Sequence, residues 1–253
     1  MKATYEIFHA ELGIPERDLC AKQINEVLGK RVPRLGTPTV YLRTFEEAEE
    51  YLQDSPISFV HIPAYVKNGG SFPPTSGAMG VWISNYLAYK KFLETDNDIL
   101  FLFEDDAMVS ENFFEVASSY YPQLPENWDF WALFVPDDCR QWYFYPRANQ
   151  PWVRSNDGGP TTYDMGLPDV CRNYQDWSCA GYAVSRKGAE LAVADVEANG
   201  ISNPIDWYIF NVRHLDSQTQ YFDTYSIKPS SYKPVRLFQS AHLSSSIGIT
   251  QAS

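Results

Sequence analysis

The sequence predicts an α/β domain with a largely parallel sheet flanked by helices, and two observations lead to this prediction. Short apolar runs alternate with segments of helical periodicity from Thr37 onward, which is the pattern of strand and helix units. One of these runs, residues 99–103, is wholly apolar and leads directly into three carboxylates. Such a run is typical of a central strand covered on both faces. A length of 253 residues suits one such domain.

Residues 1–36 precede this alternation and are expected to form an N-terminal helical extension. A helix is predicted to begin at Pro15, because apolar residues follow at roughly helical spacing up to Gly29. Residues 37–253 are then expected to form the main domain.

The elements of the main domain are predicted from apolar runs for strands and from helical periodicity for helices. Besides the run at 99–103, strands are expected at 39–43, 57–62, 128–135, 179–184 and 221–227. Helices are expected at 45–52, 77–93, 111–121, 186–198 and from about 206. Residues 139–178 interrupt this order with a long aromatic insert, and loops of such length in a compact domain are usually functional.

The composition narrows the class of partner and the compartment. A net charge of −12 argues against a general affinity for nucleic acid or anionic membrane, which both require a positive field. No stretch approaches the ~20 apolar residues of a membrane span, and the amino terminus lacks the apolar core of a signal peptide. A cytoplasmic protein is therefore expected. Its four cysteines include no C-x-x-C pair, so free and mostly buried thiols are expected.

The carboxylates Glu104, Asp105 and Asp106 are the strongest candidate site. They stand at the carboxyl end of a predicted strand, where open α/β sheets bind ligands, and alternation places Glu104 and Asp106 on one side. Three adjacent negative charges repel one another unless a cation compensates them, and oxygen ligands favour Mg²⁺ or Mn²⁺. The alternative is a solvated strand end. Asp137 and Asp138 are a rival acidic pair, interpreted as a turn or rim contact.

The sequence lacks the main motifs of phosphate-loop hydrolases and of dinucleotide-dependent oxidoreductases. The sequence contains no phosphate-binding loop of the G-x-x-x-x-G-K-[ST] type, no G-x-G-x-x-G fingerprint and no G-x-S-x-G elbow. With 4 His in all, a centre built from several histidines is not expected.

Four segments, taken in order, resemble glycosyltransferase family 25, which contains the lipooligosaccharide and procollagen galactosyltransferases. They read GAMGVWISN with the following helix and FLFEDDA, then WDFWAL, AGYAVSRKGAEL and PIDW. The resemblance covers roughly residues 38–246. It departs at Asn85, because family members usually have His after the serine at this point.

The resemblance implies a GT-A fold, a Rossmann-like and mostly parallel sheet flanked by helices, that uses a UDP-sugar donor and Mn²⁺ or Mg²⁺. It implies Asp106, Glu104 and a late histidine, His242, as metal ligands, although His242 is equally well explained as a surface residue. Residues implied near the nucleotide sugar are Leu42, Arg43, Gly77, Ser84, Glu104, Asp105, Gly181 and Tyr182. Plain packing explains Gly181 and Tyr182 equally well, and a salt bridge to Glu46 or Glu47 would explain Arg43.

Asp206 is the candidate base, because inverting transfer requires a group that deprotonates the acceptor hydroxyl. It follows Pro204 at a predicted helix start, where an aspartate also serves simply as an N-cap. The insert supplies Trp142, Trp152 and Trp177 as candidate acceptor contacts, since aromatic faces pack against sugar rings.

The expected function is therefore transfer of a hexose, with inversion, to a hydroxyl of a glycan, a glycoconjugate or a modified base. Nucleic acid is expected only as such a modified-base acceptor. The alternatives are a noncatalytic carbohydrate-binding protein on the same fold and a metal-dependent phosphohydrolase.

Overall fold

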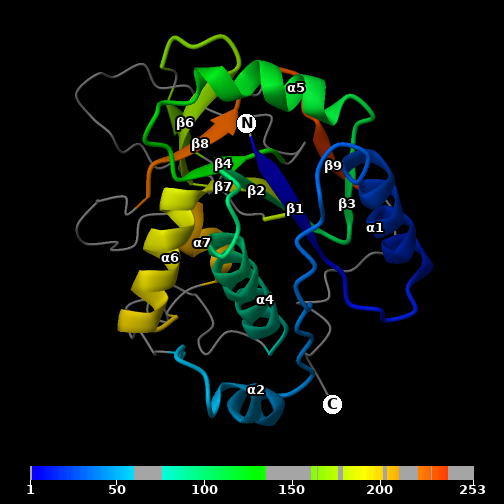
Figure 1. Ribbon diagram of the computed structural model, residues 1–253, viewed down its shortest axis with the longest axis vertical. Coiled ribbons are helices and arrows are strands. Elements are labelled where there is room, and N and C mark those ends of the chain that lie inside the picture. The colour runs from blue at the N-terminus through cyan, green and yellow to red at the C-terminus, as the bar shows by residue number, and fades with distance from the viewer. Residues whose placement is uncertain are drawn as a thin grey trace.

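A computed structural model describes residues 2–59, 76–134, 161–163, 165–175, 179–201, 204–210, 222–228 and 230–238. These residues form a mixed α/β structure around a seven-stranded sheet, shown in Figure 1. In sheet order, the strands are β1 (Ala3–Phe8), β2 (Ile99–Glu104), β7 (Gly181–Ser185), β4 (Phe130–Ala132), β8 (Thr224–Ile227), β6 (Val170–Gln175) and β5 (Thr161–Tyr163).

The α/β class predicted from the sequence is confirmed, but the sheet is mixed. Neighbouring strands run parallel in the pairs β1–β2 and β4–β8 and antiparallel in the other four pairs. The main cause is β7, which lies between β2 and β4 and runs against both. The largely parallel sheet expected from the alternation is therefore corrected.

The helices lie where the periodicity predicts them, within a few residues at each end. They are α1 (Pro15–Leu28), α2 (Phe45–Leu52), α4 (Ser76–Leu93), α5 (Phe113–Tyr120), α6 (Arg186–Asn199) and α7 (Ile205–Phe210), and a short 3-10 helix follows α5 at Tyr121–Gln123. In the part of the chain that the structure describes, no helix is long and apolar enough to cross a membrane.

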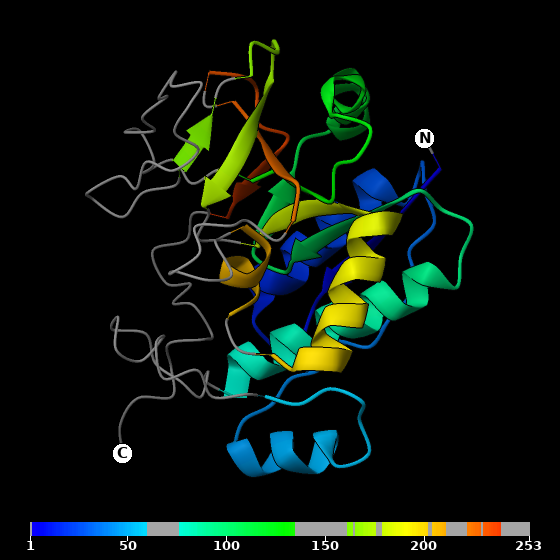
Figure 2. The ribbon, with the colours of Figure 1, turned by 90° about the vertical axis from the view of Figure 1, so that its left-hand side faces the viewer.

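The central strands bury side chains on both faces of the sheet, and this divides the core into two parts. Leu100 and Leu102 of β2 pack with α4, α6 and α7. Phe101 and Phe103, which alternate with them, pack with α1 and α5 on the other face. Figures 1 and 2 show α4 and α6 side by side on their face of the sheet. The wholly apolar composition of β2 follows from this double coverage.

Residues 1–36 are integral to the sheet, which the sequence analysis missed. Helix α1 forms as predicted, but β1 precedes it and pairs in parallel with the whole of β2, from Ala3 opposite Ile99 to Phe8 opposite Glu104. Glu6 is fully buried in β1 and accepts hydrogen bonds from Arg34 Nε (2.7 Å) and the Thr37 backbone (2.5 Å). The expected helical extension is therefore a strand followed by a helix, both packed into the domain.

The strand predicted at 39–43 is wrong. This segment packs its backbone on a helix, because Val40 N donates to the buried Ser84 Oγ of α4 (2.8 Å). Gly80 permits the close approach, since a Cβ there would lie 2.5 Å from Val40 O. Of the strand predicted at 57–62, the structure describes residues 57–59, with an isolated bridge between Phe59 and Ile201.

Two further strands lie inside the predicted insert, where a loop was expected. Strands β5 and β6 pair antiparallel, and β6 joins the sheet through β8. A separate two-stranded sheet joins β3 (Ala107–Val109), which directly follows the acidic run, to β9 (Val235–Leu237). Glu104, Asp105 and Asp106 therefore lie where the chain turns from β2 into β3, and they are called the acidic turn below.

Candidate functional site

The three carboxylates lie where β2 ends and the chain turns into β3. Glu104 is the last residue of β2 and pairs with Phe8, so the loop after β1 lies beside the turn. Asp105 is only 3% exposed, whereas Glu104 and Asp106 are partly open to solvent. The site thus lies beyond the carboxyl ends of two parallel strands, which is a usual place for ligands in α/β proteins.

Asp105 is held by the N-terminal segment. Arg17 of α1, itself 8% exposed, donates to Asp105 Oδ1, and His9 Nδ1 lies 3.0 Å from Asp105 Oδ2. His9 Nε2 in turn lies 3.0 Å from Asp18 Oδ1. Both carboxylate oxygens of Asp105 are therefore occupied by protein groups, and its predicted contact with a nucleotide remains a prediction.

Neighbouring carboxylates, Asp206 among them, act electrostatically on Glu104. Burial, followed by the negative charges of Asp106, Asp206 and Asp105, raises the pKa of Glu104 to about 8, and Arg17 opposes this shift. Burial also raises the pKa of Asp106, again opposed by Arg17. Asp206 stands in the first turn of α7. The structure thus brings the predicted base close enough to Glu104 for their charges to interact.

Asp106 has a side-chain oxygen whose hydrogen-bonding capacity is not satisfied by the described residues. Its Oδ1 is buried and has no hydrogen-bond partner among the described residues. Its backbone oxygen accepts from Phe238 N (2.8 Å), which fixes the turn against the chain after β9. A buried carboxylate oxygen without a partner carries a desolvation cost that a bound cation would offset.

The donor set suits a hard cation, but it is small. Glu104 and Asp106 offer oxygen ligands of the kind that Mg²⁺ and Mn²⁺ prefer, and these ions often complete their shell with water and substrate phosphate. Within the described ranges, no group of three or more His, Cys, Asp and Glu side chains is placed to hold a metal. The third predicted ligand, His242, lies outside those ranges, as do Asp137 and Asp138 and the predicted acceptor contacts Trp142, Trp152 and Trp177.

Leu42 and Arg43 lie on the segment that packs on α4. Leu42 is buried in the core, and the backbone N–H of Arg43 donates to Glu47 Oε2 (2.7 Å) at the start of α2. Together with Tyr41 and Tyr51 they line a shallow hollow of about 540 Å³. Glu47 thus contacts the backbone of Arg43, and no salt bridge of the Arg43 side chain to Glu46 or Glu47 is present among the described residues.

Gly77 and Ser84 lie on α4, and their predicted role at the nucleotide sugar remains a prediction. Gly77 stands in the first turn of the helix. Ser84 is fully buried, donates to Gly80 O (2.8 Å) and accepts from Val40 N. The hydroxyl of Ser84 therefore joins two elements of the fold.

Gly181 and Tyr182 start β7 beside the end of β2. A Cβ at Gly181 would lie 2.7 Å from the Val235 side chain, so close packing explains this glycine. The Tyr182 hydroxyl is buried, donates to Asn85 Oδ1 and lies 2.5 Å from the Tyr89 hydroxyl. Asn85 stands where the family resemblance predicted His, and it joins Tyr182 and Tyr89 in a buried set of hydrogen-bonded side chains. Packing inside the fold therefore accounts for the contacts of Gly181 and Tyr182.

His9 and Arg17 were missed by the sequence analysis. A signal for Arg17 is present, because it shares the buried side of α1 with Cys20, Ala21, Ile24 and Leu28. A basic residue on an otherwise apolar helix stripe needs a buried partner of opposite charge. Cys20 is also close enough to the carboxylates to interact with them. Burial, and then the negative charges of Asp106 and Asp105, raise the pKa of the Cys20 thiol to about 11.

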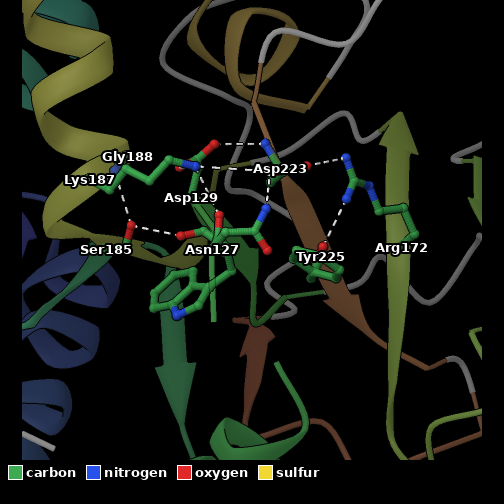
Figure 3. Close-up of polar contacts among 9 residues, drawn as sticks. Asn127, Asp129, Arg172, Ser185, Lys187, Gly188, Asp223 and Tyr225 are labelled. Atoms are coloured by element: carbon green, nitrogen blue, oxygen red, sulfur yellow. Dashed lines mark hydrogen bonds and ion pairs between the residues drawn. The ribbon is translucent and has the colours of Figure 1, made fainter. Parts of the chain in front are cut away.

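A second polar cluster, drawn in Figure 3, lies at the end of the sheet opposite the three carboxylates, because the end of β2 pairs with the start of β7 and the start of β4 pairs with the end of β7. Asp129 and Asp223 immediately precede the parallel strands β4 and β8, and Asp129 Oδ2 accepts from Asp223 N (2.8 Å). Lys187 Nζ lies 2.9 Å from Asp129 Oδ1, and Arg172 Nη2 donates to Asp223 Oδ1 (2.6 Å). Because every carboxylate here has a basic partner, this cluster acts as a brace between β4, β6, β8 and α6.

Comparisons with known proteins leave the family open. No protein-family model matches the chain, and no curated protein matches it. The glycosyltransferase assignment therefore depends on the residue pattern and on the geometry of the acidic turn.

Proposed function

We propose that the protein is a metal-dependent glycosyltransferase of the GT-A fold that transfers a hexose from a UDP-sugar to a hydroxyl acceptor. Glu104 and Asp106 would hold Mn²⁺ or Mg²⁺, which supplies positive charge opposite the departing diphosphate. The nucleotide sugar would lie beyond the ends of β1 and β2. The acceptor class includes glycans, glycoconjugates and modified bases.

The observation that carries this proposal is the buried Oδ1 of Asp106, which has no partner among the described residues and follows Glu104 at the end of β2. Burial, and then the negative charges of Asp106, Asp206 and Asp105, raise the pKa of Glu104, so a cation would stabilise this site. The position of this site, beyond the ends of two parallel strands, supports a nucleotide ligand.

Asp206 would accept the proton from the acceptor hydroxyl as that oxygen attacks the anomeric carbon. The new bond forms between the acceptor oxygen and this carbon, the bond to the diphosphate oxygen breaks, and UDP leaves. Attack on the face opposite the leaving group inverts the configuration. The raised pKa of Glu104, to which Asp206 contributes, supports a location of Asp206 beside the metal ligands.

The test is a panel of UDP-sugars and hydroxyl acceptors, with UDP release and product formation measured in Mn²⁺ and in EDTA. We expect metal-dependent transfer that Asp106→Asn abolishes. The control is Asp96→Asn, because the Asp96 side chain is 86% exposed and pairs with Lys2 at the surface. This variant is expected to keep wild-type activity.

Asp206→Asn separates the role of the base from that of the metal. We expect this variant to bind Mn²⁺ and UDP like the wild type and to lose transfer by about 100-fold or more, the usual range for a general base. Transfer at the wild-type rate by folded Asp206→Asn would refute its assignment. Phosphate release without any need for an acceptor would instead favour a phosphohydrolase.

A further inference from the structure

The N-terminal helix holds the acidic turn and the following strand at two points. At one end, Arg17 of α1, with His9 from the loop before the helix, occupies the two carboxylate oxygens of Asp105. At the other end, the Gln23 side chain makes two hydrogen bonds to the backbone of Val109. Gln23 Nε2 donates to Val109 O (2.6 Å), and Gln23 Oε1 accepts from Val109 N (3.1 Å). Helix α1 thus spans the segment from Asp105 to Val109 and contacts it on both sides of Asp106.

Burial makes the contact between Arg17 and Asp105 costly to break. Arg17 is 8% exposed and Asp105 3% exposed, so removal of Asp105 leaves the Arg17 charge buried without this partner, and removal of Arg17 leaves the buried Asp105 with His9 alone. The adjoining peptide carries Asp106, whose buried Oδ1 has no partner among the described residues. A change in the orientation of Asp105 would therefore move Asp106 as well.

We propose that Arg17 and Asp105 are positioning residues that orient the turn so that Glu104 and Asp106 present their carboxylates together to a divalent cation. This inference rests on the proposed function, because it concerns the same metal site. It assigns to the first 36 residues a part in that site, which the sequence pattern alone did not indicate.

The charge of Arg17 supports this role. Because Arg17 compensates the charge of Asp105, the turn can hold three carboxyl groups in close sequence while two of them remain available to a ligand.

The test is a direct titration with Mn²⁺, in which the electron paramagnetic resonance signal of the free ion measures how much Mn²⁺ is bound. Arg17→Met keeps an unbranched apolar side chain, similar to the stem of arginine, and removes the charge. We expect it to weaken Mn²⁺ binding by about 10-fold to 100-fold, the usual effect of removing a group that orients a metal ligand. Arg17→Lys, which keeps the charge without the planar fork, is expected to bind with intermediate affinity.

The matched control is Arg34→Met. Arg34 comes from the same N-terminal segment and also pairs with a buried carboxylate, Glu6, at 2.7 Å. Its loss is expected to lower stability, as loss of Arg17 does, but to leave Mn²⁺ affinity unchanged. A reduced affinity in Arg34→Met equal to that in Arg17→Met would overturn the proposal, because both effects would then reflect stability alone.

The outcomes distinguish the two proposals. A wild-type protein that binds no Mn²⁺ overturns both the proposed function and this inference. A wild-type protein that binds Mn²⁺, together with folded Arg17 variants that bind it equally well, overturns only the inference. If Arg17→Met does not fold, Arg17→Lys decides the question, since unchanged affinity in that variant contradicts a positioning role.

Discussion

At the scale of single residues, the acidic turn combines groups with opposite requirements. Asp105 is ionically paired and buried, while burial and then neighbouring negative charges raise the pKa of Glu104 and Asp106. Natural proteins usually place such uncompensated carboxylates at functional sites, where a ligand supplies the missing charge. Three neighbours in sequence therefore differ, because Asp105 is held in an ion pair and Glu104 and Asp106 are the two that we propose to bind a cation.

This arrangement predicts how stability depends on pH in the absence of metal. The pKa of Glu104 is raised from 4.5 to about 8 in the folded state, so between these values the folded protein binds more protons than the unfolded chain. The free energy of unfolding should therefore fall as pH rises from 4.5 to 8, by at most about 1.4 kcal/mol per pH unit for one proton. Urea titrations in EDTA across this range measure it.

Glu104→Gln is the control for that measurement, because the amide does not titrate. Its stability should depend less on pH over the same interval, and added Mn²⁺ should stabilise the wild type but not this variant near pH 8. An identical pH profile for both proteins would show that Glu104 titrates normally.

At the scale of elements, Ser185 joins a strand to a helix. It ends β7, and its Oγ accepts from Gly188 N (3.0 Å) as the N-cap of α6 and donates to Trp128 O (2.8 Å). Gly188 packs directly against the backbone of Asp129, since a Cβ at this glycine would lie 2.5 Å from Asp129 O. The start of α6 is therefore fixed to the start of β4 by one hydroxyl and one glycine.

Ser185→Ala should lower the free energy of unfolding by about 1–2 kcal/mol, because it removes a cap and leaves the Trp128 carbonyl without this donor. The matched variant is Thr44→Ala, which removes the exposed cap of α2, a single bond of 3.3 Å from Glu47 N. Its expected loss is smaller. Equal losses in chemical denaturation would contradict the second role of Ser185.

The sequence predicted elements where one local pattern decides the structure, and it failed where distant contacts do. Strand β2 and helix α4 were predicted because apolar content and periodicity suffice to define them. The segment 39–43 has strand-like composition but packs on a helix through Ser84 and Gly80. Such a pairing depends on residues distant in sequence, which periodicity does not report.

The candidate site shows the same division. The place of Glu104 to Asp106 after a buried strand could be predicted, whereas the choice of Asp206 as base stays a prediction. The partners His9 and Arg17 could not, because β1 contains the polar residues Thr4 and Glu6 and was not recognised as a strand. Burial of Glu6 depends on Arg34 and Thr37, which lie beyond α1.

At the scale of the whole molecule, β1 stands at one edge of the sheet and covers β2 along its full length. A protein restricted to residues 37–253 would expose the backbone of β2 and the apolar groups beneath α1, and exposed apolar strand edges aggregate. We expect this variant to lose cooperative thermal unfolding, as monitored by near-ultraviolet circular dichroism. A cooperative transition at the wild-type temperature would show that the first 36 residues are a dispensable extension.

The contact between Phe238 N and Asp106 O has a consequence for the order in which the protein becomes competent during synthesis. Domains begin to fold from the N-terminus as the chain emerges from the ribosome. β1, α1 and β2 emerge early and bring Arg17 to Asp105, but β3 receives its partner β9 only when residues 235–237 follow. The acidic turn is thus completed only after residues 235–238 have been made, so a nascent chain would contain most of the sheet before this turn takes its final form.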